Sequence, residues 1–297
     1  MSTGVLALLG SLVVLAVWFV VRWARLEHRR ATLPRPRPNL VDSVIGFVTN
    51  FFDTLGIGSF APTTAAFKLQ RRVADEQIPG TLNVGHALPT FVEAMIFIAA
   101  VQVDVWTLTG MIAAAVLGAW MGVGVITRLP RRSIQIGMGA ALLVAVMLFT
   151  AKNLDWMPGG GDALGLQGPT LAFAIGVSFV LGGLMMLGIG MYAPCLILVS
   201  LLGMNPLAAF PIMMGACAFL MPVGGVRFVQ SGHYNPGAAL SLALGGIPGV
   251  LVGAFIVKSL PMVWIRWLVV VVVLYAAAQM LLSAYRESPR RSMAAQP

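Results

Sequence analysis

Charged residues are scarce in this chain: Asp, Glu, Lys and Arg together make up only 10% of its 297 residues. A soluble domain of ordinary composition carries about a quarter charged residues. Hydrophobic residues make up 59%, and they fall in runs of about 20, the length that crosses the hydrocarbon core of a bilayer. The composition excludes an ordinary soluble domain and predicts an all-α polytopic membrane protein.

Cysteine is nearly absent, with only Cys195 and Cys217, and both lie inside apolar segments. Neither has a His or a second Cys at metal-ligand spacing, so we expect no disulfide framework and no metal site. The chain also lacks a Gly-x4-Gly-Lys-[Ser/Thr] loop and a His-Glu-x-x-His motif. We therefore expect no cofactor, no enzymatic activity and no primary pump formed by this chain alone.

Acidic residues are the rarer charge, with 10 Asp and Glu against 19 Lys and Arg, which gives a net charge of +9. The basic residues lie in short clusters between the apolar runs, as the positive-inside bias predicts. No soluble domain presents them on one face. We therefore expect no nucleic-acid partner.

The first apolar run, 3–21, has no positive n-region and no clear small-x-small cleavage site. Six arginines follow it, from Arg22 to Arg37. This pattern predicts an uncleaved anchor with its N-terminus outside the cell membrane. We predict that residues 1–39 form this anchor and a basic linker in which Pro34, Pro36 and Pro38 alternate with other residues.

The remainder of the chain divides into two similar halves. Leu-Gly-Ile-Gly at 55–58 recurs at 187–190, and Phe-Ala-Pro at 60–62 matches Tyr-Ala-Pro at 192–194 at the same offset. A second match lies near the other end of each half, where Gly-x3-Gly is followed by Leu-Pro with identical internal spacing. Two matches in register predict a structural repeat.

The second match joins Gly118, Gly122 and Leu129-Pro130 to Gly249, Gly253 and Leu260-Pro261. Small residues four apart bring helices close together. We expect them to pack helices of one chain, and a homodimer through the same glycines is the alternative.

Two segments, 40–67 and 170–203, are long and broken near their centres by Gly-x-Gly and then by Pro. Glycine and proline disfavour a continuous helix, and irregular backbone at membrane depth must line a protected cavity. We predict that each is a re-entrant hairpin that returns to the side from which it entered. The other apolar runs predict spans at 81–101, 107–127, 133–151, 206–228, 237–257 and 262–284.

The distribution of positive charge supports the hairpins. If both return, only Lys152, Lys258 and Arg266 of the 19 basic residues lie outside. If both cross fully, the asymmetry is much weaker. With two returning hairpins, the C-terminus is predicted to be cytoplasmic.

Three spans follow each hairpin, and since three is odd, the second copy begins on the opposite side of the membrane. The repeats are therefore predicted to be inverted, an architecture typical of secondary transporters. The predicted units are a first repeat at 40–151, an extracytoplasmic loop at 152–169, a second repeat at 170–285 and a cytoplasmic tail at 286–297.

The hairpin tips have the chemistry of an anion site. The returning half of each would aim a helix N-terminus, with unpaired N–H groups and a partial positive charge, at the centre of the membrane. Pro62 and Pro194 fit the first turn of such half-helices. The glycines that permit the turn and a close approach of the anion are Gly56, Gly58, Gly188 and Gly190.

The other residues that we predict to bind the substrate are Ser59, Phe60, Thr63, Thr64, Asn83, Tyr192 and Cys195. The alternative is that the glycines serve only close helix packing. The same proline after the same break in both copies favours the anion site, because packing alone rarely requires it twice.

Segment 81–101 carries Asn83, His86, Thr90 and Glu93, and steps of three, four and three place them on one helical face. Ionisable residues in a membrane span are functional by default. Glu93, His86 and Asp53 are our candidates for proton coupling. In the alternative interpretation Glu93 is permanently protonated or paired with a hydroxyl, His86 is a hydrogen-bonded packing residue, and Asp53 caps the turn.

The stretch Gly-Phe-Val-Thr-Asn-Phe-Phe-Asp-Thr-Leu-Gly-Ile-Gly-Ser-Phe-Ala at 46–61 resembles the N-terminal motif of the TauE/SafE sulfite-exporter (TSUP) permeases, and 182–190 is a weaker echo of it. The resemblance covers about 40–285 and leaves out the N-terminal anchor. It implies an anion-transporting permease of the cell (inner) membrane. The second copy has Met185 where the first has Asp53, so a coupling role of Asp53 is not duplicated.

By this resemblance the substrate is a small sulfur-containing anion, sulfite or an organosulfonate. The inside-negative membrane potential favours export of an anion over its uptake. The expected partners are that anion and the lipid bilayer, with a homodimer as a further option. The alternatives are an anion channel on the same fold and, with less support, a membrane-embedded enzyme or a receptor.

Overall fold

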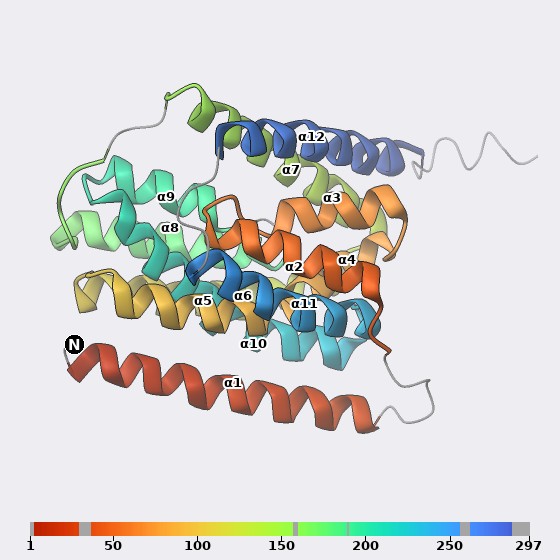
Figure 1. Ribbon diagram of the computed structural model, residues 1–297, viewed down its shortest axis with the longest axis horizontal. Helices are drawn as coiled ribbons and strands as arrows, with labels where there is room; N and C mark the ends of the chain where they lie inside the picture. Colours follow the sequence, from red (N-terminus) through yellow and green to blue (C-terminus); the bar gives the residue numbers. More distant parts are fainter. Residues whose placement is uncertain (1–2, 30–36, 157–159, 189, 256–261, 287–297) are drawn as a thin grey trace, which may run out of the picture.

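The computed structural model describes residues 3–29, 37–156, 160–188, 190–255 and 262–286, and over these ranges the chain is helical without a β-strand. Helix α1 (Thr3–Arg29) lies along one face, and α7 (Arg131–Asn153) packs with α12 (Met262–Arg286) along the opposite face (Figure 1). The other elements, in chain order, are α2 (Leu40–Thr54), α3 (Phe60–Gln70), η1 (Asp75–Gln77), α4 (Ile78–Gly85), α5 (Ala87–Ala100), α6 (Val105–Ile126), α8 (Gly168–Met185), α9 (Tyr192–Leu201), η2 (Pro206–Ala208), α10 (Ala209–Ser231) and α11 (Pro236–Phe255).

Six helices of the described chain are long and apolar enough to cross a bilayer: α1, α6, α7, α8, α10 together with η2, and α11. The bent pair formed by α4 and α5 is a seventh candidate if it counts as one span. The predicted class, an all-α polytopic membrane protein, is confirmed.

Helices α2 and α3 form the first predicted hairpin, and its two open ends are bonded together. Arg72, just after α3, donates to the side chain of Asn39 at 2.8 Å and to the carboxylate of Asp42 in the first turn of α2. The hydrogen bond to Asp42 raises the pKa of the Arg72 guanidinium. The chain therefore returns to the end from which α2 started (Figure 1).

Helices α8 and α9 form the second hairpin, which starts from the opposite end of the molecule (Figure 1). Its open end is also closed by hydrogen bonds, here between backbone groups. The amide of Asn205 donates to the carbonyl of Ala163 at 2.9 Å, and the amide of Gly161 donates to that of Met204 at 3.0 Å. Both predicted segments are thus broken and turn back.

Glycine ends the first half of each hairpin in the same way. Gly56 and Gly188 have φ values of 88° and 95°, in the left-handed region that favours glycine. The amide of Gly56 donates to Asp53 O at 2.8 Å, and that of Ile57 donates to Phe52 O at 3.0 Å, the pair of bonds that ends a helix at a left-handed glycine. The repeated Leu-Gly-Ile-Gly motif is therefore a repeated helix stop.

The predicted continuous span at 81–101 is wrong in one respect, because it is bent by 41° between α4 and α5. The bend lies at His86, three residues before Pro89. Proline has no N–H to donate four residues back, and its ring clashes with that carbonyl, here the one of Gly85. Asn83, His86, Thr90 and Glu93 are nevertheless all buried.

The glycines of the second sequence match pack helices of this chain. A Cβ atom on Gly122 of α6 would lie 2.7 Å from Gly183 O of α8, and one on Gly253 of α11 would lie 3.0 Å from Phe51 O of α2. Gly183 and Phe51 are themselves separated by the repeat offset. The packing of α6 on α8 thus corresponds to that of α11 on α2, as an inverted repeat requires, and it involves no second chain.

The N-terminal anchor is longer than predicted and belongs to the helical body. Helix α1 continues through Arg22 and Arg25, which we had placed in a linker, and packs against α10 and α5. Trp23 donates from its indole nitrogen to the Tyr234 hydroxyl at 3.2 Å. The predictions for Pro34 and Pro36, Ile189, Lys258, Leu260-Pro261 and the tail from 287 onwards fall outside the described residues.

Candidate functional site

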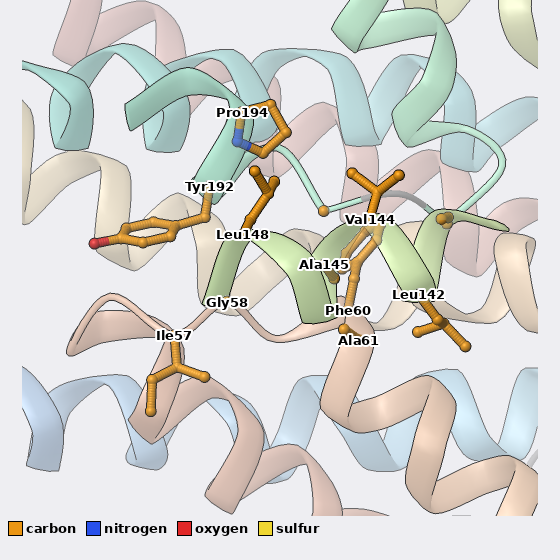
Figure 2. Close-up of a pocket in the computed structure, with 13 residues that line it drawn as sticks. Ile57, Gly58, Phe60, Ala61, Leu142, Val144, Ala145, Leu148, Tyr192 and Pro194 are labelled. Atoms are coloured by element: carbon orange, nitrogen blue, oxygen red, sulfur yellow. The ribbon is translucent and has the colours of Figure 1, made fainter. Parts of the chain in front are cut away.

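The tips of the two hairpins meet inside the molecule. Ile57, Gly58 and Phe60 of the first tip and Tyr192 and Pro194 of the second line one apolar cavity of about 40 Å³, with side chains of α7 between them (Figure 2). The approach is reciprocal. A Cβ atom on Gly58 would lie 3.7 Å from Tyr192 Cβ, and one on Gly190 would lie 3.7 Å from Phe60 Cβ.

A second, more polar cavity lies beside the tips, and we call it the central cavity. Its volume is about 30 Å³, enough for about two water-sized groups. The residues that line it are Asp53, Gly58, Ser59, Phe60, Thr90, Met185, Gly190, Met191, Tyr192, Met213, Met214 and Cys217. Most of these lining residues are buried.

Helix N-termini border the central cavity from two sides. The first intrahelical amide bonds are Thr63 N to Ser59 O and Cys195 N to Met191 O, both at 3.0 Å. The third residue of α3 and of α9 is a proline, which has no N–H, so the amides that lack a partner within their own helix are those of the first two residues, and each N-terminus carries a partial positive charge. The positive ends of two helices therefore border one cavity, and no Lys or Arg of the described chain lines it.

Asp53 is the acidic residue of the central cavity. It is buried, as is Ser59, whose hydroxyl and backbone amide interact with its carboxylate. An ionised carboxylate here would repel an anion at short range, in surroundings of low dielectric.

Glu93 is fully buried and does not line this cavity. Its Oε1 atom is 3.0 Å from the Thr54 hydroxyl, and its Oε2 atom has no hydrogen-bond partner among the described residues. The Thr54 hydroxyl also lies 2.9 Å from Asn50 O, and it has only one proton to donate. If that proton goes to Asn50 O, the usual bond of a helical threonine, then Glu93 must be the donor and neutral.

His86 connects the two halves of the first hairpin. Its Nδ1 atom is 2.9 Å from the Asn50 amide nitrogen on α2, and its Nε2 atom is 3.0 Å from the Thr63 hydroxyl on α3. The imidazole sits at the bend between α4 and α5 and is fully buried. These bonds are the ones that the packing interpretation of His86 predicts.

The other predicted residues lie close to the tips but have different surroundings. Gly56 faces the Tyr192 ring, and Gly188 lines the apolar cavity. Asn83 donates to Pro79 O at 2.9 Å. Cys195 is buried next to Cys217 without lining the central cavity.

Sequence reasoning missed the sulfur-rich wall of the central cavity. Met185, Met191, Met213, Met214 and Cys217 all line it, and the Cys217 thiol is 3.5 Å from Met185 Sδ. Methionine is a common core residue in apolar helices, so its spacing alone carried no signal. For Met185 and Met191 alone a signal was present, because they stand in the second hairpin at the positions of Asp53 and Ser59 in the first.

Two broken helical hairpins meet at an internal polar cavity, an arrangement typical of secondary transporters. In comparison with known families, the model described as Sulfite exporter TauE/SafE matches residues 2–149 and 170–297. The chain belongs to this family. The match includes α1, so the expectation that the N-terminal helix lies outside the family resemblance is wrong.

No curated protein and no solved structure matches the chain. Over the described residues, no group of three or more His, Cys, Asp or Glu side chains could hold a metal ion.

Proposed function

We propose that this protein is a secondary transporter that exports a small sulfur-containing anion, sulfite or an organosulfonate, across the cell membrane. The anion binds between the N-termini of α3 and α9, and two inverted repeats rock around it. The N-terminus lies outside and the C-terminus is cytoplasmic. The observation that carries this proposal is the central cavity, which both hairpin tips border.

The substrate-binding groups of this proposal are backbone amides first and hydroxyls second. Gly58 and Gly190 leave room beside the helix ends, and Ser59 supplies a hydroxyl at the cavity wall. Thiol and thioether groups form the opposite part of the wall and suit a polarizable substrate. The description of the family, a sulfite exporter, supports a sulfur oxyanion as the substrate class.

Proton coupling in this proposal resides at Asp53. Because an ionised Asp53 repels the anion, the proton and the anion bind together. A divalent sulfite that moves with one proton still carries one negative charge outward. The inside-negative potential favours that movement by about 2.3 kcal/mol per 100 mV.

Thermal stabilisation of the purified protein by sulfite, methanesulfonate, thiosulfate and sulfate tests the proposal. We expect sulfite or the sulfonate to stabilise the protein, and Ser59→Ala to weaken binding by about tenfold, since a hydrogen bond to a charged group contributes about 1.5–3 kcal/mol. Ser178→Ala is the matched control, because Ser178 is equally buried and does not line either cavity at the tips. If no sulfur oxyanion shifts the melting temperature, the substrate class is wrong.

An anion channel on the same fold is the second candidate. The small volume of the central cavity favours a carrier, which must rearrange to pass its substrate. Counterflow separates the two. Proteoliposomes loaded with unlabelled sulfite accumulate labelled sulfite transiently if the protein is a carrier, and do not if it is a channel.

A further inference from the structure

One end of the molecule carries a basic hollow that the proposed site leaves unused. Its volume is about 560 Å³, within the range of small-molecule sites. Four cationic side chains and one carboxylate line it: Lys68, Arg71, Arg131, Arg286 and Asp75. They come from α3, the turn after it, η1, α7 and α12, so the tertiary structure assembles them.

Within the described chain, two of these four cationic side chains are paired with carboxylates and two are not. Lys68 binds both oxygens of Asp75, at 2.7 and 2.8 Å, and Arg131 pairs with Glu76 at 3.3 Å. Among the described residues, Arg71 and Arg286 have no carboxylate within 4.0 Å. A cleft lined by one sign of charge concentrates ions of the opposite sign.

Helix α3 connects this hollow to the central cavity. Phe60 lines the central cavity and Lys68 lines the hollow. Residues four apart share a helical face, so Thr64 lies between them on the same face, and the whole distance is about 12 Å at 1.5 Å per residue.

Thr64 supplies an independent sign of a ligand on this face. It is fully buried, and its hydroxyl has no hydrogen-bond partner among the described residues. Its neighbour Thr63 is bonded to His86. A buried hydroxyl without a partner costs free energy, and a passing oxyanion would supply the missing acceptor.

Asp75 holds Lys68 in place at this end of α3. Its carboxylate is almost completely buried and accepts bonds from Lys68 of α3 and, at 2.9 Å, from Gln135 of α7. Lys68 also donates to Ser283 of α12 at 3.0 Å. One ion pair therefore joins α3 to α7 and α12, across the two predicted repeats.

We propose that a small oxyanion moves between the central cavity and the basic hollow along the Phe60–Thr64–Lys68 face of α3, and that the hollow is a second anion site at the mouth of this path. In the hollow the oxyanion replaces the oxygens of Asp75 at Lys68, which opens the ion pair. Arg71 and Arg286 hold the anion there. This inference rests on the proposed transport function, but its first test does not require a transported substrate.

The first test is the accessibility of a cysteine at Thr64. Thr64→Cys and the control Ala65→Cys are equally buried and adjacent on α3, but Ala65 lies on a different face. The protein is placed in phosphatidylcholine vesicles, and an anionic or a cationic methanethiosulfonate reagent is added from each side in turn. The wild-type chain, whose two cysteines are buried, gives the background rate.

We expect the anionic reagent, added at the basic end, to modify Thr64→Cys about tenfold faster than Ala65→Cys, in line with electrostatic focusing in charged clefts. Asp75→Asn should raise the rate further, because Lys68 is then released. Equal rates at the two positions, or faster modification by the cationic reagent, would overturn the path.

The second test is transport by Arg71→Gln with Arg286→Gln. We expect the half-saturating sulfite concentration measured from the basic end to rise about tenfold. The control is the pair Arg128→Gln with Arg132→Gln, which removes the same charge at the same end. Neither residue lines the hollow, so this pair should change the half-saturating concentration little. An equal effect of the two pairs contradicts the site.

Lipid phosphate could occupy a basic hollow, and the vesicles distinguish this case. If the half-saturating sulfite concentration of the double variant differs from that of its control only when phosphatidylglycerol is present, the hollow binds lipid and the proposal is wrong. If the wild-type protein transports no sulfur oxyanion, the proposed function fails, while the cysteine experiment still decides whether the path exists.

Discussion

The two hairpins have the same backbone and different side chains. At the repeat offset, Asp53 corresponds to Met185, Ser59 to Met191 and Thr63 to Cys195. The helix stop, the left-handed glycine and the proline in the returning half occur in both. The comparison indicates that the backbone part of the anion site is duplicated, whereas the hydroxyls and the acid belong to the first hairpin alone.

The largest effect should come from the glycines that both hairpins share. Gly56→Ala places a Cβ atom at φ 88° and against the Tyr192 hydroxyl, and we expect a loss of about 3 kcal/mol, from about 1–2 kcal/mol for the left-handed backbone plus displacement of the ring. Gly188→Ala meets only the ends of flexible side chains, Met138 at 3.2 Å and Leu82 at 3.6 Å, and should cost less. Thermal unfolding in detergent compares the two variants, and equal losses would contradict the asymmetry.

His86 is the next test, because the second repeat has Ala218 at the corresponding position. His86→Ala leaves Asn50 and Thr63 without their buried partner, which should cost about 2 kcal/mol. His86→Gln keeps an amide in reach and should recover part of the stability. If His86 carries protons instead, both variants would abolish the pH dependence of transport with little change in unfolding.

Asp53→Asn makes the acidic position of the first hairpin permanently neutral. In the wild type, affinity for a sulfonate that stays ionised should fall by up to about tenfold per pH unit once Asp53 loses its proton, because one proton is linked to binding. The variant should bind with an affinity that is independent of pH. Substrate-induced thermal shifts between pH 5 and pH 9 measure this, with Met185→Leu as the control in the second hairpin. A wild-type profile that is flat with pH removes Asp53 from the coupling.

Glu93→Gln should have the smallest effect. If Glu93 is neutral, Gln has nearly the same shape and can still donate to Thr54, so we expect unfolding to change by less than about 0.5–1 kcal/mol, the net contribution of an ordinary hydrogen bond. Glu93→Leu is the contrasting variant, because it removes the hydrogen bond between residue 93 and the Thr54 hydroxyl. A large loss in Glu93→Gln would show that the carboxylate is charged in the folded protein.

The broken hairpins could be predicted from the sequence because their signal is local. Gly-x-Gly followed by Pro stops one helix and starts another in any surroundings, and the charge count fixed the direction in which each hairpin returns. The bend at His86 could have been predicted from Pro89, but the regular spacing of the polar residues favoured a straight helix. Helix α1 was placed correctly, although its length and its packing against α10 were not predicted.

The site was predicted in part. Asp53, Gly58, Ser59, Phe60 and Gly190 were singled out from the two broken segments, and they line one cavity. Their role in binding an anion stays a prediction. The wall formed by Met213, Met214 and Cys217 was not found, because it comes from α10 and depends on how that helix packs. His86 and Glu93 were singled out correctly as buried groups, but only the structure shows which hydroxyls and amides they contact.

The sequence by itself determined the membrane class, the repeat, the helix breaks and the family, since these depend on composition, on spacing and on the local conformations that glycine and proline allow. The tertiary structure alone decided which groups from distant segments share a cavity, and it brought Lys68, Asp75 and Ser283 together at the basic end. The reason is physical. Contacts between helices depend on the packing of whole faces, which no short stretch of sequence contains.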